Sequence, residues 1–244
     1  MRLFLAILMI AATHHVCAGD IVPGLEIENI YKDVYLHKSY QRIEEFGLVS
    51  SNGLVVIDNK KAFIIDTPWS AKDTRALLDW IKEQDYDPVG SISTHSHEDR
   101  TAGIKSLNSQ SIPTYASNLT NEILKQENKE LAKNTFANPE AFLFDGNLEA
   151  FYPGGGHTID NIVVWLPDSK ILFGGCLVRS LQAKNLGYTG EAVVNEWSNS
   201  AGKVLSRYSE SEMVVPGHGK IGDISLLEHT VKLAERPGIA PTRP

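Results

Sequence analysis

The stretch Val89-Gly90-Ser91-Ile92-Ser93-Thr94-His95-Ser96-His97-Glu98-Asp99-Arg100 decides which fold and chemistry we expect of this chain. Its first half, residues 89–93, is mostly apolar and predicts a strand that runs into a loop. Alternation would point His95 and His97 to one side, and the loop can bring Asp99 back toward them. All three side chains are metal-ligand types, so the stretch predicts a metal site. A polar loop that merely follows a strand is the alternative.

Length and charge narrow the class of protein. The 244 residues suit one large domain or two small halves that share a core. Lys and Arg total 23 against 30 Asp and Glu, a net charge of -7, and no basic run carries interleaved aromatic residues. We therefore expect no nucleic-acid partner. No apolar stretch reaches 18 residues, so we expect no membrane span. Nothing in the sequence indicates oligomerisation, and we expect a monomer.

The amino terminus has the pattern of an export signal. Arg2 precedes a short apolar run over residues 3–12, and Val16-Cys17-Ala18 offers small residues where a signal peptidase cleaves. We expect a signal peptide over residues 1–18, one domain over residues 19–244, and a periplasmic product. A lipoprotein is the less favoured alternative, because the residues before Cys17 lack the usual pattern. Cys176 would then be the one cysteine left, without a disulfide partner in an oxidising compartment.

Strands and helices are mixed along the chain without strict alternation. This favours an α/β fold with two mixed sheets covered by helices over one doubly wound sheet. The hydrophobic periodicity predicts strands over residues 29–39, 46–56, 55–58, 62–66, 91–94, 112–116, 148–152, 161–166, 170–173 and 213–216. It predicts helices over residues 71–84, 101–108, 118–129, 195–208 and 225–235, and a loose tail from residue 236.

Three further polar clusters repeat the design of a strand followed by a tight turn. They are Pro153-Gly154-Gly155-Gly156-His157, Gly174-Gly175-Cys176 and Pro216-Gly217-His218-Gly219. Glycine lets the backbone turn sharply and lets a side chain approach another group closely. Taken singly, each could be a plain turn with an incidental His or Cys. Four such clusters at four strand ends instead indicate one shared site on the loops at an edge of the scaffold.

A count of the histidines sharpens this prediction. Two of the eight lie in the export signal, His37 lies in a predicted strand, and His229 lies in the last predicted helix. The remaining four lie on the loops, and with one Asp and one Cys they give six candidate metal ligands: His95, His97, Asp99, His157, Cys176 and His218. Six ligands suit two ions better than one, and a thiolate favours zinc over magnesium or calcium.

The pattern His95-x-His97-x-Asp99, followed by His157, Cys176 and His218, resembles the metallo-β-lactamases. The resemblance covers nearly the whole mature chain and is closest to the first subclass of class B, in particular its imipenemase-type members. It implies a four-layer αββα sandwich. It also implies one zinc on His95, His97 and His157, and a second zinc on Asp99, Cys176 and His218.

Two positions separate this family from its relatives with the same motif. Thioesterases and nucleases usually have a His directly after the Asp and a bridging carboxylate where Cys176 stands, whereas this chain has Arg100 and a thiol. Arg100 cannot bind a metal; it either tunes the second zinc site or is a solvated charge. The second subclass of the family lacks a His at the position of His95. We interpret Asp66 as a supporting structural acid.

The resemblance also implies the chemistry and the residues that touch substrate. A zinc-activated hydroxide would attack the lactam carbonyl, with Asp99 orienting it and Asn185 donating a hydrogen bond to the carbonyl oxygen. Arg179 stands where many members have a Lys that binds the substrate carboxylate. Phe46 stands where a mobile hairpin carries an exposed aromatic residue. Asn185 could instead serve a turn, and Phe46 ordinary strand packing.

We therefore expect a zinc enzyme that hydrolyses penicillins, cephalosporins and carbapenems and so confers antibiotic resistance. One alternative is another dinuclear zinc hydrolase that acts on lactones or thioesters. The other is a non-enzymatic, exported zinc-binding protein, which would need four protein ligands on each ion.

Overall fold

The computed structural model describes residues 21–236. The predicted signal peptide and nearly all of the predicted tail lie outside this range. None of the helices within it has the length and apolar character that crossing a membrane requires.

The first half of the chain forms a seven-stranded sheet in which the strands follow one another in chain order. Strands β1 to β4 pair antiparallel, and β4 to β7 pair parallel. Their bounds are β1 Glu26–Tyr31, β2 Val34–Ile43, β3 Gly47–Asp58, β4 Lys61–Ile65, β5 Asp87–Ile92, β6 Thr114–Ser117 and β7 Asn134–Phe136.

The second half forms a five-stranded sheet of order β12-β11-β10-β9-β8, in which only the β11–β12 pair is parallel. Its strands are β8 Glu140–Leu143, β9 Leu148–Phe151, β10 Val163–Leu166, β11 Ile171–Gly175 and β12 Met213–Pro216. The helices are α1 Ala71–Glu83, α2 Glu98–Thr101, α3 Ile104–Ser109, α4 Asn118–Gln126, α5 Val194–Arg207 and α6 Ser225–Ala234, with 3-10 turns at Phe144–Gly146 and Pro167–Ser169.

Strand alternation builds the layers. On β3 and β4, Leu54, Val56, Phe63 and Ile65 face inward and pack against residues of the other sheet such as Phe173. The residues between them on the same strands face outward, against the apolar sides of α1 and α3. Because the strands are buried on both faces, they read as nearly continuous apolar runs.

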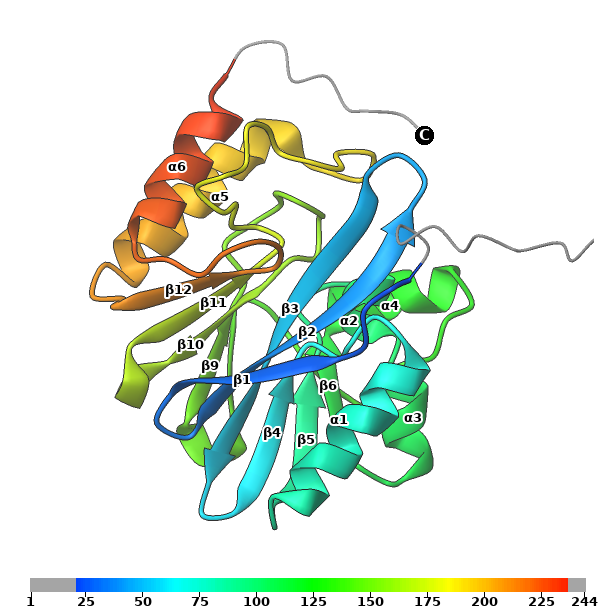
Figure 1. Cartoon of the computed structure of the whole chain (residues 1–244). Coiled ribbons are helices and arrows are strands. Elements are labelled where there is room, and N and C mark those ends of the chain that lie inside the picture. Colours follow the sequence, from blue (N-terminus) through cyan, green and yellow to red (C-terminus); the bar gives the residue numbers. More distant parts are fainter. Residues whose placement is uncertain (1–20, 237–244) are drawn as a thin grey trace, which may run out of the picture.

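The five-stranded sheet repeats this arrangement. Val164 faces the inter-sheet core, whereas its neighbours Val163 and Trp165 pack outward beneath α5 and α6, around Trp197. Three apolar clusters therefore separate four layers: helices, sheet, sheet, helices (Figure 1). This confirms the predicted sandwich of two mixed sheets flanked by helices.

Some of the strand predictions differ from the structure. Residues 29–39 do not form one strand, because the chain turns at Lys32 and Asp33, where Asp33 has a φ of 59°, and so separates β1 from β2. β2 then continues past residue 39, through the polar residues 40–42, to Ile43, because antiparallel pairing with β3 supports it there. β7 and β8 were missed, since both are short strands at a sheet edge whose residues are at most half-buried.

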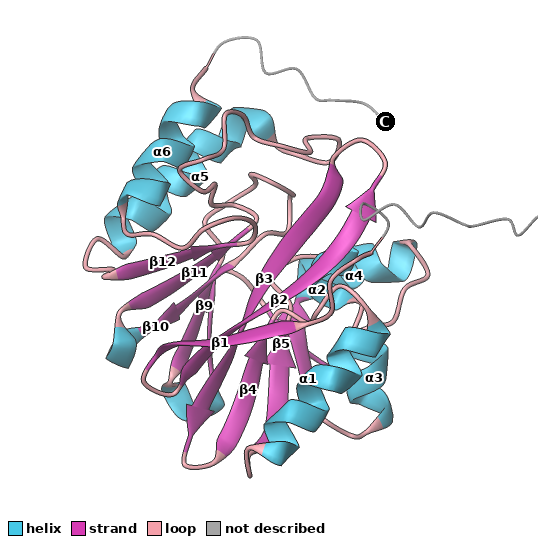
Figure 2. Cartoon of the chain, viewed as in Figure 1, coloured by secondary structure: helices cyan, strands magenta, loops and turns pink. Residues whose placement is uncertain are grey.

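The loops that follow β5, β9, β11 and β12 carry the predicted ligands. Loops gather at the upper edge of the molecule as drawn, between α5 and the β2–β3 hairpin (Figure 2). The two sheets and their covering helices supply a rigid base for this edge, which is where binding groups are commonly found.

The inter-sheet core makes a direct prediction. Phe173→Ala removes a fully buried ring between the sheets and should lower the free energy of unfolding by about 3–5 kcal/mol. The matched control is Phe142→Ala, the same chemical change at a side chain that is 66% exposed, for which we expect about 0.5 kcal/mol or less. Urea denaturation measures both. Equal losses would contradict the assignment of Phe173 to the central core.

Candidate metal centre

The loop between β5 and α2 carries His95 and His97, and Asp99 is the second residue of α2. Asp66, which follows β4, accepts hydrogen bonds from the backbone N–H of Thr94 at 2.7 Å and from its hydroxyl at 2.8 Å. This holds the chain just before His95, so His95 is buried and His97 lies at the mouth of the site. Asp66 thus has the supporting structural position that the sequence predicted.

His95, His97 and His157 form one cluster. A ring nitrogen from each lies within 4.8 Å of the others, and Nε2 of His157 lies 3.2 Å from Nδ1 of His97. The three rings stand edge to face, with centroids 4.6 to 5.0 Å apart. This arrangement lets three lone pairs converge on one point, with room for a further ligand.

Unpaired nitrogens show that this cluster fits a metal ion. Both ring nitrogens of His95 and Nδ1 of His157 are buried without a hydrogen-bond partner. Burial, with the neighbouring imidazoles, holds the pKa of His95 and of His157 well below the usual range. Both rings are therefore neutral near pH 7, which is the form that binds a metal.

Asp99, Cys176 and His218 form a second cluster beside the first. Sγ of Cys176 lies 3.2 Å from Nε2 of His218 and 3.6 Å from Oδ2 of Asp99, and that carboxylate oxygen lies 3.3 Å from Nε2 of His218. The other oxygen of Asp99 lies 4.0 Å from Nε2 of His95. The Asp99 carboxylate therefore spans the gap between the two clusters.

The second cluster attracts positive charge. Burial alone would lower the pKa of His218, but Cys176 and Asp99 raise it to about 10. Burial alone would raise the pKa of Asp99, but Arg100 and His218 hold it well below the usual range. A carboxylate and a sulfur in this setting suit a divalent cation of borderline softness, as zinc is.

Arg100 holds the residues of the second cluster in place. Its guanidinium is fully buried and contacts Oδ2 of Asp99 at 2.8 Å and Sγ of Cys176 at 2.9 Å. It also donates to the carboxylate of Asp66 at 3.2 Å and to two backbone carbonyls, those of Asn52 at 2.6 Å and of Gly217 at 3.1 Å. The alternative of a solvated Arg100 is therefore wrong.

Gly217 shows why a glycine precedes His218. A Cβ at this position would lie 2.6 Å from the guanidinium of Arg100 and 2.7 Å from both the nitrogen and the sulfur of Cys176. No side chain fits there, and the Gly217 N–H donates to the carbonyl of Gly175 at 2.7 Å. The loop after β12 can therefore bring His218 against Cys176 only with glycine at this place.

Two supporting residues were missed by the sequence analysis. Asn52 in β3 donates from its side chain to the carbonyls of Pro216 and Gly219, at 2.8 and 2.9 Å, and so holds the loop that carries His218. Its signal was a polar run, Ser50-Ser51-Asn52, inside an apolar strand. Glu191 lies with Oε2 2.5 Å from Nε2 of His97. The sequence offers no local signal for that contact.

A cleft of about 440 Å³ opens over both clusters. Two of the residues for which we expect contact with substrate line it: Phe46, which is 51% exposed at the β2–β3 hairpin, and Arg179. Asn185 does not line this cleft; it is exposed and its side chain accepts a hydrogen bond from the N–H of Gly187 at 3.0 Å. The turn that was the alternative for Asn185 is therefore present.

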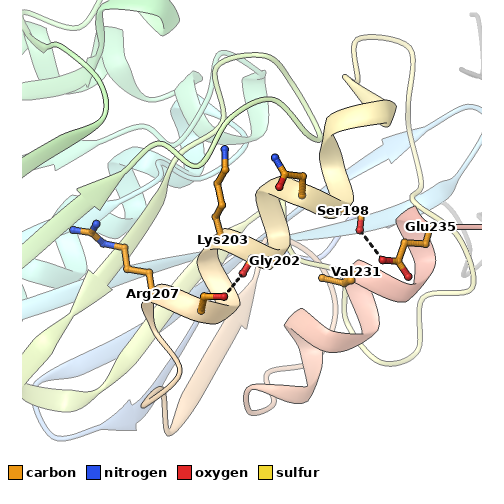
Figure 3. Close-up of a pocket in the computed structure, with 8 residues that line it drawn as sticks. Ser198, Gly202, Lys203, Arg207, Val231 and Glu235 are labelled. Carbon is orange, nitrogen blue, oxygen red and sulfur yellow. Dashed lines mark hydrogen bonds between the residues drawn. The ribbon is translucent and has the colours of Figure 1, made fainter.

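A second hollow, of about 670 Å³, lies between α5 and α6 (Figure 3). The residues that line it include no His, Cys or Asp. Ser198 in this hollow donates to Glu235 at 3.2 Å, and Ser206 donates to the carbonyl of Gly202 at 3.0 Å. Glu235 is therefore the one side chain of a metal-ligating type that lines this hollow.

Two adjoining clusters of His, Asp and Cys on the loops of a four-layer sandwich define a protein with a dinuclear metal centre. The family model described as the metallo-beta-lactamase superfamily matches residues 46–218, and the chain belongs to this family. The two clusters provide the ligands for two zinc ions, as the sequence predicted.

Known metallo-beta-lactamases are similar to this chain in sequence and structure over most of its length. A metallo-beta-lactamase type 2 of Pseudomonas aeruginosa is 46% identical over 213 residues, which are 87% of this chain and 85% of the relative. The crystal structure of the metallo-beta-lactamase DIM-1 exposed to ceftazidime is 63% identical with a TM-score of 0.88, covering 88% of this chain and 99% of that one. The structure of TMB-1 is 64% identical with a TM-score of 0.86, covering 88% and 98%.

The burial of Arg100 makes the second prediction. Arg100→Ala leaves Asp66 and Asp99 without their buried countercharge, and we expect a loss of about 3–5 kcal/mol in the free energy of unfolding. Arg75→Ala, at an exposed position of α1, should cost about 0.5 kcal/mol or less. Both are measured by urea denaturation in excess chelator, so that metal loss does not contribute. An Arg100 variant as stable as the Arg75 variant would refute this role.

Proposed function

We propose that this protein hydrolyses the amide bond of β-lactam antibiotics with two zinc ions, and that its substrates include penicillins, cephalosporins and carbapenems. The observation that carries the proposal is the pair of ligand clusters, each with three protein ligands, at the floor of an open cleft. Three ligands leave each ion a position for water or substrate, which a zinc-storage protein would close.

Bound zinc supplies a Lewis acid for the lactam carbonyl and lowers the pKa of a coordinated water to near 7. The residues of the chain orient the reactants. Asp99 reaches both clusters, since one carboxylate oxygen lies 4.0 Å from His95 and the other 3.3 Å from His218. It can accept a hydrogen bond from a water between the clusters and so point that water's lone pair at the carbonyl carbon.

Substrate would be held by side chains around the cleft. Burial lowers the pKa of Arg179 from its ordinary value, and Nε of Arg179 is buried without a hydrogen-bond partner, so a carboxylate ligand would satisfy it. Phe46 would cover the apolar part of the substrate from the β2–β3 hairpin. Asn185 would donate its amide N–H to the lactam oxygen, which requires its loop to move toward the cleft.

We also propose that residues 1–18 are a cleaved signal peptide, that residues 19–244 form the mature enzyme, and that it acts as a monomer in the periplasm. The apolar run after Arg2 and the small residues up to Ala18 support export. Cys176, buried against Arg100, is the one free cysteine of residues 21–236, which suits an oxidising compartment because a buried thiol does not form stray disulfides.

The purified mature protein tests the function directly. It should hydrolyse a chromogenic cephalosporin and a carbapenem, lose that activity to a strong chelator, and regain it as about two zinc ions bind per chain. A lactone and a thioester form the comparison arm and should react far more slowly. Hydrolysis of the cephalosporin that survives complete zinc removal would overturn the proposal, and a preference for the lactone or thioester would move it to another hydrolase class.

Arg179 makes a separate prediction about binding. Arg179→Ala should reduce kcat/KM for a cephalosporin about 10- to 150-fold, mostly through KM, because a hydrogen bond between charged groups contributes about 1.5–3 kcal/mol. The methyl ester of the same cephalosporin, which lacks the carboxylate, serves as the control. Wild type and variant should hydrolyse the ester at similar rates. An equal loss on acid and ester would show that Arg179 does not bind this carboxylate.

A further inference from the structure

The outer nitrogens of the ligand histidines have different surroundings. Nδ1 of His218 lies 2.7 Å from the backbone carbonyl of Ser50, and the outer nitrogens of His95 and His157 have no partner. Among these four histidines, His97 alone meets a side-chain carboxylate through its outer nitrogen, at 2.5 Å from Oε2 of Glu191. A carboxylate and a carbonyl differ in charge, so His97 has a support that no other ligand histidine has.

Hydrogen bonds connect the loop that carries Glu191 to the segment that carries His157. The N–H of Val193, two residues on, donates to the carbonyl of Gly156 at 2.9 Å, next to His157. The side chain of Glu196 accepts from the N–H of Gly155 at 3.2 Å. These two hydrogen bonds fix the two segments relative to each other. They therefore help to place the Glu191 carboxylate beside His97.

This contact determines which nitrogen of His97 carries the proton. A carboxylate accepts a hydrogen bond, so Nε2 of His97 must be the donor, and Nδ1 then keeps its lone pair. That Nδ1 is the atom that lies 3.2 Å from Nε2 of His157, inside the cluster.

We infer that Glu191 is a positioning residue for the three-His zinc site: it selects the His97 tautomer with a free Nδ1 and strengthens that nitrogen as a ligand. The inference rests on the proposed zinc function of the same cluster. A hydrogen-bonded carboxylate behind a ligand imidazole orients the ring and increases its basicity. The second site has only the Ser50 carbonyl in this place, so Glu191 favours occupation of the first site over the second.

The exposure of Glu191 and its neighbours indicates that replacing Glu191 would affect His97 and not the fold. Glu191 is about half exposed (52%) and His97 less so (22%), which means that removing the carboxylate leaves no buried charge behind. Lys129, which also lines the cleft, pairs with Glu127, since its ammonium lies 2.8 Å from that carboxylate. Lys129 therefore keeps a countercharge when Glu191 is replaced. Glu191→Ala should therefore leave the fold intact while it changes His97.

Metal binding to the full mature chain tests the inference without reference to catalysis. In Glu191→Ala, the three-His site should bind zinc about 10- to 100-fold more weakly in competition with a chromogenic chelator. The affinity of the second site should stay within about threefold. With one equivalent of Co(II), the thiolate-to-cobalt absorption of Cys176 should become stronger than in wild type, because more of the ion enters the second site.

Two further variants separate positioning from a simple loss of charge. Glu191→Gln keeps an oxygen that accepts from Nε2 of His97, so most of the first-site affinity should return. Glu45 is also an exposed carboxylate, and, in addition to burial, its charge raises the pKa of Tyr188 as that of Glu191 does. Glu45→Gln therefore changes the net charge by the same amount and should alter neither metal site. Nitrogen NMR of the chelator-treated protein should show His97 protonated at Nε2 in wild type and as a mixture of tautomers in Glu191→Ala.

The outcomes are distinct. An unchanged Co(II) distribution and unchanged stepwise zinc affinities in Glu191→Ala would overturn the inference, as would equal changes in Glu45→Gln. A wild-type chain that binds two zinc ions with this distribution but hydrolyses no β-lactam would contradict the proposed function and leave the positioning role of Glu191 standing.

Discussion

The structure depends on one buried cation. Arg100 has no exposed surface, and its guanidinium contacts carbonyls or side chains from both sheets: Asn52 of β3 and Asp66 after β4 on one side, Cys176 after β11 and Gly217 after β12 on the other. Taking a charge out of water costs several kcal/mol, and nearby countercharges and hydrogen-bond acceptors offset that cost. The contacts of Arg100 are thus satisfied only when the loops of the two sheets meet, and when they do, Asp99 and Cys176 are already in position.

The two ligand clusters differ in electrostatic character although they adjoin. Burial keeps the histidines of the first cluster neutral, which leaves their lone pairs available. The second cluster places a carboxylate and a sulfur beside a guanidinium, so its negative charge is partly balanced before any ion binds. Preorganised groups of this kind reduce the reorganisation that metal binding and catalysis require. Asp99 joins the two clusters, and it alone among the six ligands directly precedes the buried Arg100 in the chain.

Residue type and spacing were enough to predict much of this. Counting histidines by their place in strands, helices and loops singled out the six ligands, because donors on loops at strand ends can share one edge of the scaffold. Apolar strands mixed with helices, without strict alternation, predicted the two sheets. Local patterns were insufficient where pairing decides structure: β2 extends through a polar segment because β3 pairs with it, and β7 and β8 are too short and exposed to show a period. The state of Arg100, buried rather than solvated, also lay beyond any local pattern.

By itself, the sequence determined the chemistry of the site: which atoms can bind zinc, which glycines permit close approach, and which faces of the strands are apolar. These properties belong to single residues and their immediate neighbours. Only the tertiary structure decided which groups support them. Arg100 meets a carbonyl 117 positions away, Asn52 holds a loop 164 positions away, and Glu191 reaches His97 across 94 positions. Such contacts form only after the two sheets have packed, because their geometry is set by the shared core and not by spacing along the chain.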